Sequence, residues 1–163
     1  MIGENIKILG FRANIGSVGE TLSKIGDIKK DGEIIQLLNA DAVAGQNHII
    51  HGVNQAFLAF DRGENLANDI SVEIVVRCSA QRQISKAFNI LGLKEGDMNL
   101  CAVLVNCDDY SSDLSGLFDR NDDVLSPDVD KLKEIYKIGD VELEKMSVED
   151  ILVDRITKLT VDY

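Results

Sequence analysis

The sequence predicts an α/β protein: a small mixed, partly antiparallel sheet of about four strands, flanked by helices and followed by two C-terminal helices. Short apolar or β-branched runs alternate with amphipathic segments, and this alternation favours one sheet covered by helices. The apolar runs are short, so the sheet is expected to be small. The chain has 163 residues, of which 45% are hydrophobic, and this length and composition predict a single domain over residues 1–163.

The first three elements are expected to be a strand, a helix and a strand. Residues 6–11 (IKILGF) have the composition of a strand. Residues 17–30 are predicted to form a helix, because Ser17 followed three residues later by Glu20 is typical of a capping box. Residues 33–38 (EIIQLL) are predicted to form the second strand.

The middle of the chain is expected to add a helix, a strand and a helix. Residues 47–62 show the clearest helical pattern, since apolar side chains recur there at spacings of three and four. Residues 70–78 (ISVEIVVRC) are rich in β-branched side chains that alternate between two faces, and they predict a strand. Residues 79–91 predict a further helix that ends at Gly92.

The remaining elements are a strand and mainly helices. Residues 100–106 (LCAVLVN) predict a buried strand, and residues 110–120 a short helix or loop. A helix over residues 128–137 is expected to follow Pro127. The last helix is expected over residues 147–159, with Ser147 at its N-terminus.

The net charge and the cysteine content limit the classes of ligand and the cellular compartment that are expected for the protein. The formal net charge of −11 argues against general electrostatic binding to nucleic acid or to an anionic membrane, although it leaves room for a local basic patch. Three cysteines without a C-x-x-C pair suit a reducing compartment. No secretory signal and no apolar run of about 20 residues is visible, so we expect a cytoplasmic protein that does not enter the membrane.

No motif of an active site or a cofactor site is present. Residues 10–19 carry glycines before a helix but lack the lysine of a phosphate-binding loop. His48 and His51 lie three apart on one predicted helix, yet a zinc site needs at least a third ligand. We therefore expect no cofactor, no metal and no catalytic residue.

One group of basic residues stands out in this acidic chain. Arg62 ends one predicted helix, Arg77 lies near the end of the predicted strand 70–78, and Arg82 and Lys86 follow at helical spacing on one face of the next helix. These side chains could grip phosphates near a helix N-terminus. The alternative is that they are surface charges balancing acids such as Asp69 and Glu73.

The last predicted helix has a wide apolar arc. Part of this arc should pack on the sheet, and the rest is a candidate surface for a partner protein. The alternative is a helix packed entirely within its own core. The candidate partner-binding residues are Val148, Ile151, Leu152, Arg155, Ile156 and Leu159.

Three segments together resemble a known family. They are residues 46–65 (QNHIIHGVNQAFLAFDRGEN), 70–93 (ISVEIVVRCSAQRQISKAFNILGL) and 135–156 (IYKIGDVELEKMSVEDILVDRI). In order and spacing they are similar to the PRPK-binding protein family of the KEOPS complex, in its archaeal type, over most of residues 5–160.

The resemblance implies a non-catalytic subunit of the KEOPS complex, which makes threonylcarbamoyladenosine in tRNA. It implies binding to the small atypical protein kinase/ATPase subunit and help in recruiting tRNA through its 3′ CCA end. A single-stranded RNA end needs cations for its phosphates and flat surfaces for its bases. With the resemblance, Arg62, Arg77, Arg82 and Lys86 become candidates for the former, and His48 and His51 for stacking or hydrogen bonding.

Two other functions remain open at this point. One is a small-molecule enzyme with a pocket near His48, His51 and Arg77, which would require a histidine of perturbed pKa beside a carboxylate. The other is a purely structural kinase-binding protein that does not contact RNA. A homodimer is possible when the protein is isolated from its partners.

Overall fold

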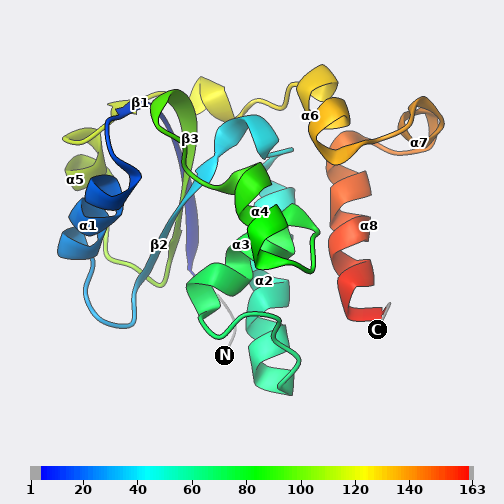
Figure 1. Ribbon diagram of the computed structural model, residues 1–163, viewed down its shortest axis with the longest axis horizontal. Coiled ribbons are helices and arrows are strands. Elements are labelled where there is room, and N and C mark those ends of the chain that lie inside the picture. The colour runs from blue at the N-terminus through cyan, green and yellow to red at the C-terminus, as the bar shows by residue number, and fades with distance from the viewer. Residues whose placement is uncertain (1–4, 162–163) are drawn as a thin grey trace.

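The computed structural model describes residues 5–161 and contains one four-stranded sheet (Figure 1). The strand order is β2-β3-β1-β4. The predicted α/β class with a small, partly antiparallel sheet of about four strands is confirmed, and every neighbouring pair of strands is antiparallel. The strands are β1 (Ile6–Ile15), β2 (Ile34–Asn39), β3 (Gly96–Val105) and β4 (Asp119–Arg120).

Helices cover both faces of this sheet (Figure 1). The larger apolar cluster contains buried side chains of α2, α3, α4, α6 and α8, whereas the smaller one contains those of α1 and α5. The helices are α1 (Val18–Ile28), α2 (Gln46–Arg62), α3 (Ile70–Ser79), α4 (Ile84–Leu91), α5 (Ser111–Ser115), α6 (Val129–Tyr136), α7 (Asp140–Lys145) and α8 (Val148–Val161). Two short 3-10 turns, η1 (Ala40–Ala42) and η2 (Asp122–Leu125), complete the described part.

Strands β1 and β3 form the centre of the sheet. They pair along their full lengths, from Ile6 opposite Val105 to Ile15 opposite Gly96. Because successive side chains of a strand point to opposite faces, alternate residues of β1 and β3 enter the two apolar clusters. Both strands extend beyond the predicted ranges 6–11 and 100–106 at the end where Ile15 meets Gly96.

Several predicted helix ends are confirmed. The Ser17 hydroxyl accepts a hydrogen bond from the Glu20 N–H at the start of α1, and the Ser147 hydroxyl accepts one from the Asp150 N–H before α8. Gly63 ends α2 with a φ of 69°, a left-handed conformation that glycine adopts readily.

The prediction of a strand over residues 70–78 is wrong, because this segment is helix α3. Asp69 caps the helix by accepting a hydrogen bond from the Ser71 N–H, and Ala80 ends it in the left-handed conformation. Every residue from 73 to 79 is buried. A helix that is buried on all sides has no polar face, so its sequence does not show the helical period. Its β-branched side chains then resemble those of a strand.

Helices α2 and α3 pack unusually close together. A Cβ atom on Gly52 of α2 would lie 2.3 Å from Cys78 Sγ of α3. Only glycine allows this approach of the two backbones.

Smaller differences from the predicted elements occur elsewhere in the chain. The predicted helix over residues 79–91 begins only at Ile84, because Ala80 and its neighbours form the turn after α3. Helix α7 and the two-residue strand β4 were not predicted. Within residues 5–161, no helix has the length and apolar character needed to cross a membrane.

Candidate functional site

Two of the predicted phosphate-binding residues lie on the surface near α4. Arg82 precedes this helix and Lys86 lies in it, and both side chains are exposed. Arg62 is also exposed, at the C-terminal end of α2. These three cations are therefore accessible to a ligand.

Arg77 is not on the surface, which contradicts its predicted contact with phosphate. Its side chain is 1% exposed and lies on α3, where its Nε donates a 2.7 Å hydrogen bond to Glu73 Oε2 one turn earlier. Its Nη2 donates to the Glu64 carbonyl, and within residues 5–161 its Nη1 has no hydrogen-bond partner. The misread strand explains the error, since the helix turns this residue inward.

Glu73, the partner of Arg77, also holds the chain before α3. Its Oε1 accepts hydrogen bonds from the backbone N–H groups of Leu66 and Ala67. A fully buried carboxylate is tolerated only when it is paired and hydrogen-bonded in this way. The pair thus belongs to the structural core.

His48 is buried as well, which contradicts its predicted role in stacking on RNA. Its Nδ1 accepts a hydrogen bond from the Ala44 N–H at 3.0 Å, so its Nε2 carries the proton and donates to the Cys78 carbonyl at 2.7 Å. Burial lowers the pKa of His48 to about 4, because desolvation disfavours the charged ring. The ring bridges α2 to the end of α3 and stays neutral near pH 7.

His51 is half-buried and joins α2 to α8. Its Nε2 lies 2.7 Å from Thr157 Oγ1, and the Thr157 hydroxyl donates its own hydrogen to the Val153 carbonyl. The His51 ring is therefore the donor in this contact. Burial also lowers the pKa of His51.

The apolar side of α8 packs inside the protein, against the prediction that it faces a partner. The five apolar candidates, Val148, Ile151, Leu152, Ile156 and Leu159, are all buried. Glu149 fastens the start of α8 to α2, since its carboxylate accepts hydrogen bonds from the N–H groups of Asn47 and His48. The apolar face of α8 therefore agrees with the alternative interpretation, in which this helix packs entirely within the core of the protein.

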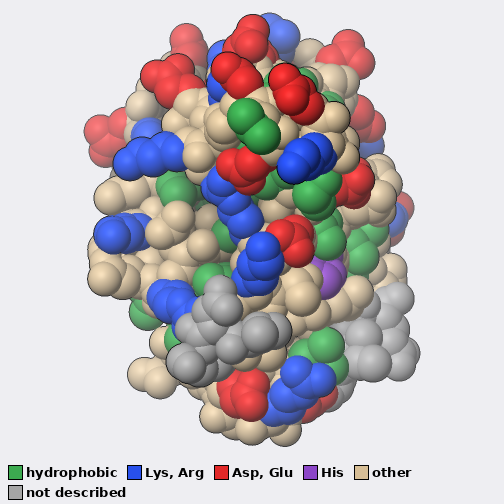
Figure 2. Space-filling model, turned by 90° about the vertical axis from the view of Figure 1, so that its right-hand side faces the viewer, with side chains coloured by type: hydrophobic (Ala, Val, Ile, Leu, Met, Phe, Trp, Pro, Cys, Tyr) green, Lys and Arg blue, Asp and Glu red, His purple; other side chains and the backbone are tan. Residues whose placement is uncertain are grey.

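Arg155 and Lys158 on α8 and Arg82 before α4 line one hollow of about 340 Å³, together with Ala80 and Leu159. Arg155 is oriented by hydrogen bonds to the Tyr136 carbonyl at 2.6 Å and to Glu142, and Lys158 forms an ion pair with Asp154. Figure 2 shows the face over α6, α7 and α8, where acidic side chains gather at the upper end and several Lys and Arg side chains lie below them, with acidic side chains among them. The hollow can attract an anion despite the acidic net charge.

Lys158 is the member of this hollow that was missed. Arg155 and Lys158 are three apart on a predicted helix, so their shared face was visible in the sequence. Their proximity to Arg82 was not, because it depends on the packing of α8 beside the turn at Ala80.

The residues of the alternative enzyme site gain no support from the hollows described in residues 5–161. The four main hollows of residues 5–161 contain none of His48, His51 and Arg77 in their linings. The ring nitrogens of His48 contact backbone groups and no carboxylate. Within the described residues, no group of three or more His, Cys, Asp or Glu side chains is placed to hold a metal ion.

Comparisons with known proteins agree on one family. Residues 13–158 match the model of the family described as "Kinase binding protein CGI-121". The chain is also similar to the "Regulatory protein Cgi121" of Methanocaldococcus jannaschii, with 38% identity over 111 residues, which are 63% of this chain and 70% of that protein.

We predict that Arg77→Met lowers the free energy of unfolding by about 3–5 kcal/mol, because it leaves the Glu73 carboxylate buried without its cation. The double variant Glu73→Gln/Arg77→Met should recover most of the loss, since glutamine keeps the acceptor for Leu66 and Ala67. Urea denaturation measures both. A single variant as stable as the wild type would contradict the structural role of the pair.

We predict that His48 makes the protein less stable in acid. Its pKa is about 4 when folded and about 6.5 when unfolded, so between these values the unfolded state binds the extra proton. The contribution is fully present above pH 6.5 and falls by about 3 kcal/mol down to pH 4. Urea denaturation across this range should show a shallower pH dependence for His48→Gln than for the control His51→Gln. If the free energy of unfolding depends equally on pH in the wild type and in His48→Gln, the pH dependence does not come from His48.

Proposed function

Because the chain belongs to the CGI-121 family of kinase-binding proteins, we propose that it is a non-catalytic regulatory subunit of the KEOPS complex. The observation that carries this proposal is the family match, which spans residues 13–158 and so nearly the whole described chain. The name of the archaeal relative, a regulatory protein, favours a role without catalysis. In this proposal the partner is the small atypical kinase/ATPase subunit, and the setting is the cytoplasm.

The second part of the proposal is that the subunit helps to recruit tRNA through its 3′ CCA end. The support is the hollow beside α8 that Arg82, Arg155 and Lys158 line, with Lys86 exposed four residues after Arg82. Phosphates are held by such cations, and a −11 chain needs them gathered on one surface to bind RNA at all. Arg62 and the half-buried His51 remain candidates, whereas Arg77 and His48 are dropped from the proposal because they are buried.

Stacking of RNA bases has a candidate that the sequence did not suggest. Phe88 and Ile84 are four apart on α4, and both are partly exposed. At 100° per residue they lie on the flank of α4 that is roughly opposite to Lys86. A strand crossing α4 would meet cations on one flank and apolar surface on the other, as single-stranded nucleic acid requires.

For the kinase we propose a contact at the outer side of α7 and α8. The apolar residues of α8 are buried, but α7 lies beyond α8 at the edge of the molecule (Figure 1) and carries Val141, 65% exposed, with Met146, 39% exposed, just after it. Large apolar side chains exposed together are typical of protein interfaces. Arg155 reaches this region through its hydrogen bond to Glu142.

We predict that Arg82→Glu/Lys86→Glu weakens binding to full-length tRNA by about tenfold or more at low salt. Loss of two phosphate contacts should also reduce the slope of log affinity against log salt by about 1.4. Fluorescence anisotropy at two salt concentrations, with intact tRNA and tRNA lacking its CCA end, measures both.

The control is Lys24→Glu/Lys94→Glu, which makes the same change of charge at exposed lysines elsewhere. If both double variants weaken binding equally, only net charge matters. Wild-type binding indifferent to the CCA end, or no binding, favours the alternative of a purely structural kinase-binding protein.

We predict that Val141→Glu/Met146→Glu weakens binding to the kinase subunit at least tenfold, about 1.4 kcal/mol or more, because it places charges in an apolar contact. Isothermal titration with the purified kinase subunit measures this, and circular dichroism checks the fold. Leu22→Glu is the matched control, since Leu22 is 50% exposed on α1, across the sheet. Unchanged affinity of the α7 variant would move the search to Ile84 and Phe88.

A further inference from the structure

One end of the sheet extends beyond the helices that cover it. On the face of β1 that carries Ile6 and Ile8 in the larger apolar cluster, the pattern changes to Arg12 and Asn14. The paired strand β3 changes in the same way, to Asn99 and Asp97. A polar patch therefore replaces the apolar core where the helices end.

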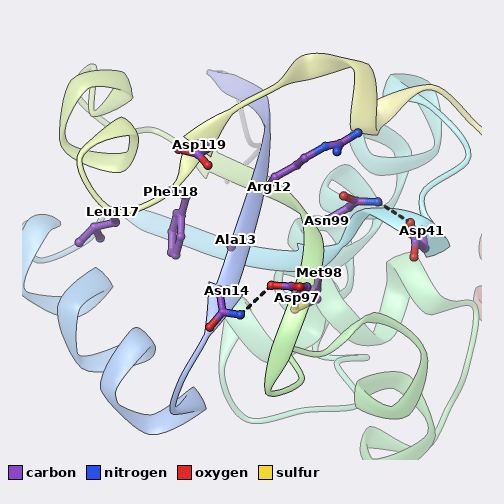
Figure 3. Close-up of a pocket in the computed structure, with 10 residues that line it drawn as sticks. All are labelled: Arg12, Ala13, Asn14, Asp41, Asp97, Met98, Asn99, Leu117, Phe118 and Asp119. Atoms are coloured by element: carbon purple, nitrogen blue, oxygen red, sulfur yellow. Dashed lines mark hydrogen bonds between the residues drawn. The ribbon is translucent and has the colours of Figure 1, made fainter.

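These polar side chains form two facing pairs across the strands. Arg12 lies opposite Asn99, and Asn14 opposite Asp97. Asn14 Nδ2 donates to Asp97 Oδ1 at 2.6 Å, and Asn99 Nδ2 donates to Asp41 Oδ1 at 3.1 Å. Figure 3 shows Leu117 and Phe118 on one side of β1 and Arg12, Asn99 and Asp41 on the other. Both amides keep their carbonyl oxygens as acceptors for a ligand.

The outer edge of β1 is open beside this patch. The Gly10 N–H donates to Asp122 Oδ1 and its carbonyl accepts from the Asn121 N–H, so the backbone of Gly10 faces outward. Because the direction alternates along a strand, the backbone of Arg12 and Asn14 also faces outward. Strand β4 ends after pairing with Phe11 and Arg12, and among residues 5–161 no strand pairs with the outer edge at Asn14.

A groove follows this open edge. A hollow of about 570 Å³ and a second of about 180 Å³ share Asn14, Leu117 and Phe118 in their linings. Leu117 is 37% exposed and gives the groove an apolar wall. Its open strand edge suits an extended chain better than a compact small molecule.

The charges of the groove favour a basic ligand. The two linings contain more acidic residues than basic ones. The acidic residues are Asp41, Asp97, Asp119 and Glu20, and the basic residues are Arg12 and Lys24. The strong net negative charge of the chain adds to this field. A polyanion such as RNA would be repelled here, in contrast to the basic hollow at α8.

We propose that this groove binds an extended, basic segment of a partner protein. The segment adds to the edge of β1 by hydrogen bonds to the Asn14 backbone, and one of its N–H groups also reaches the side-chain carbonyl oxygen of Asn14. An apolar side chain packs on Leu117, and Lys or Arg side chains meet Asp97 and Asp119. This surface is separate from those proposed for the kinase and for tRNA, so an experiment that contradicts one of the three proposals leaves the other two standing.

The test uses the full chain and a panel of hexapeptides that alternate lysine or arginine with an apolar residue. Nuclear magnetic resonance titration should shift the amides of Asn14 and Leu117, and glutamate-containing counterparts should bind about tenfold more weakly or not at all. Asp97→Lys/Asp119→Lys should weaken the basic peptides by about tenfold. The control Asp27→Lys/Asp31→Lys, at the other end of α1, should not.

Backbone N-methylation of the peptides should abolish binding, since it removes the donors that pair with the strand edge. The proposal is overturned if no basic peptide shifts these amides at millimolar concentration, or if the Asp97/Asp119 variant binds them as well as the wild type. Shifts caused at the same amides by a single-stranded hexaribonucleotide instead of the peptides would also overturn it.

Discussion

The close contact between α2 and α3 is the constraint on which the rest of the structure depends. The two backbones approach at Gly52 and Cys78, where no side chain larger than that of glycine fits. One turn earlier the neutral ring of His48 crosses from α2 to the Cys78 carbonyl. This contact sets where α3 ends, and the end of α3 decides where the turn at Ala80 and the cation at Arg82 lie.

Helix α8 takes its position from the same pair of helices. Glu149 caps the start of α2, and Thr157 accepts a hydrogen bond from His51 two turns further along α8. These two polar contacts lie about two turns apart along α8, so together they fix its position beside α2. The consequence is that Arg155 and Lys158 lie beside Arg82, and a basic hollow forms on an acidic protein.

The candidate surfaces divide the molecule by charge. The basic hollow and α4 suit an RNA end, the exposed apolar residues of α7 suit a protein partner, and the acidic groove at the open end of the sheet suits a basic peptide. Arg155 links the first two surfaces, because it lines the hollow and hydrogen-bonds Glu142 of α7.

Sequence patterns predicted the exposure of candidate residues correctly in some cases and not in others. Arg82 and Lys86 were predicted from helical spacing, and both are exposed as expected. Arg77 and His48 have the residue types of a ligand site, but their burial depends on contacts with Glu73, Ala44 and Cys78 that spacing does not reveal. The partner of a buried polar group comes from tertiary packing.

The sequence by itself determined the α/β class, the helix α2 with its stop at Gly63, the strands β1, β2 and β3, and the family. These predictions depend on the periodicity of apolar residues, on helix-capping residues and on similarity to a family along the chain. None of these requires knowing which elements are neighbours in space. Only the tertiary structure decided that residues 70–79 are helical and that the apolar face of α8 lies inside. A segment buried on all sides loses the polar face that reveals its period, so only the surrounding packing can select its conformation.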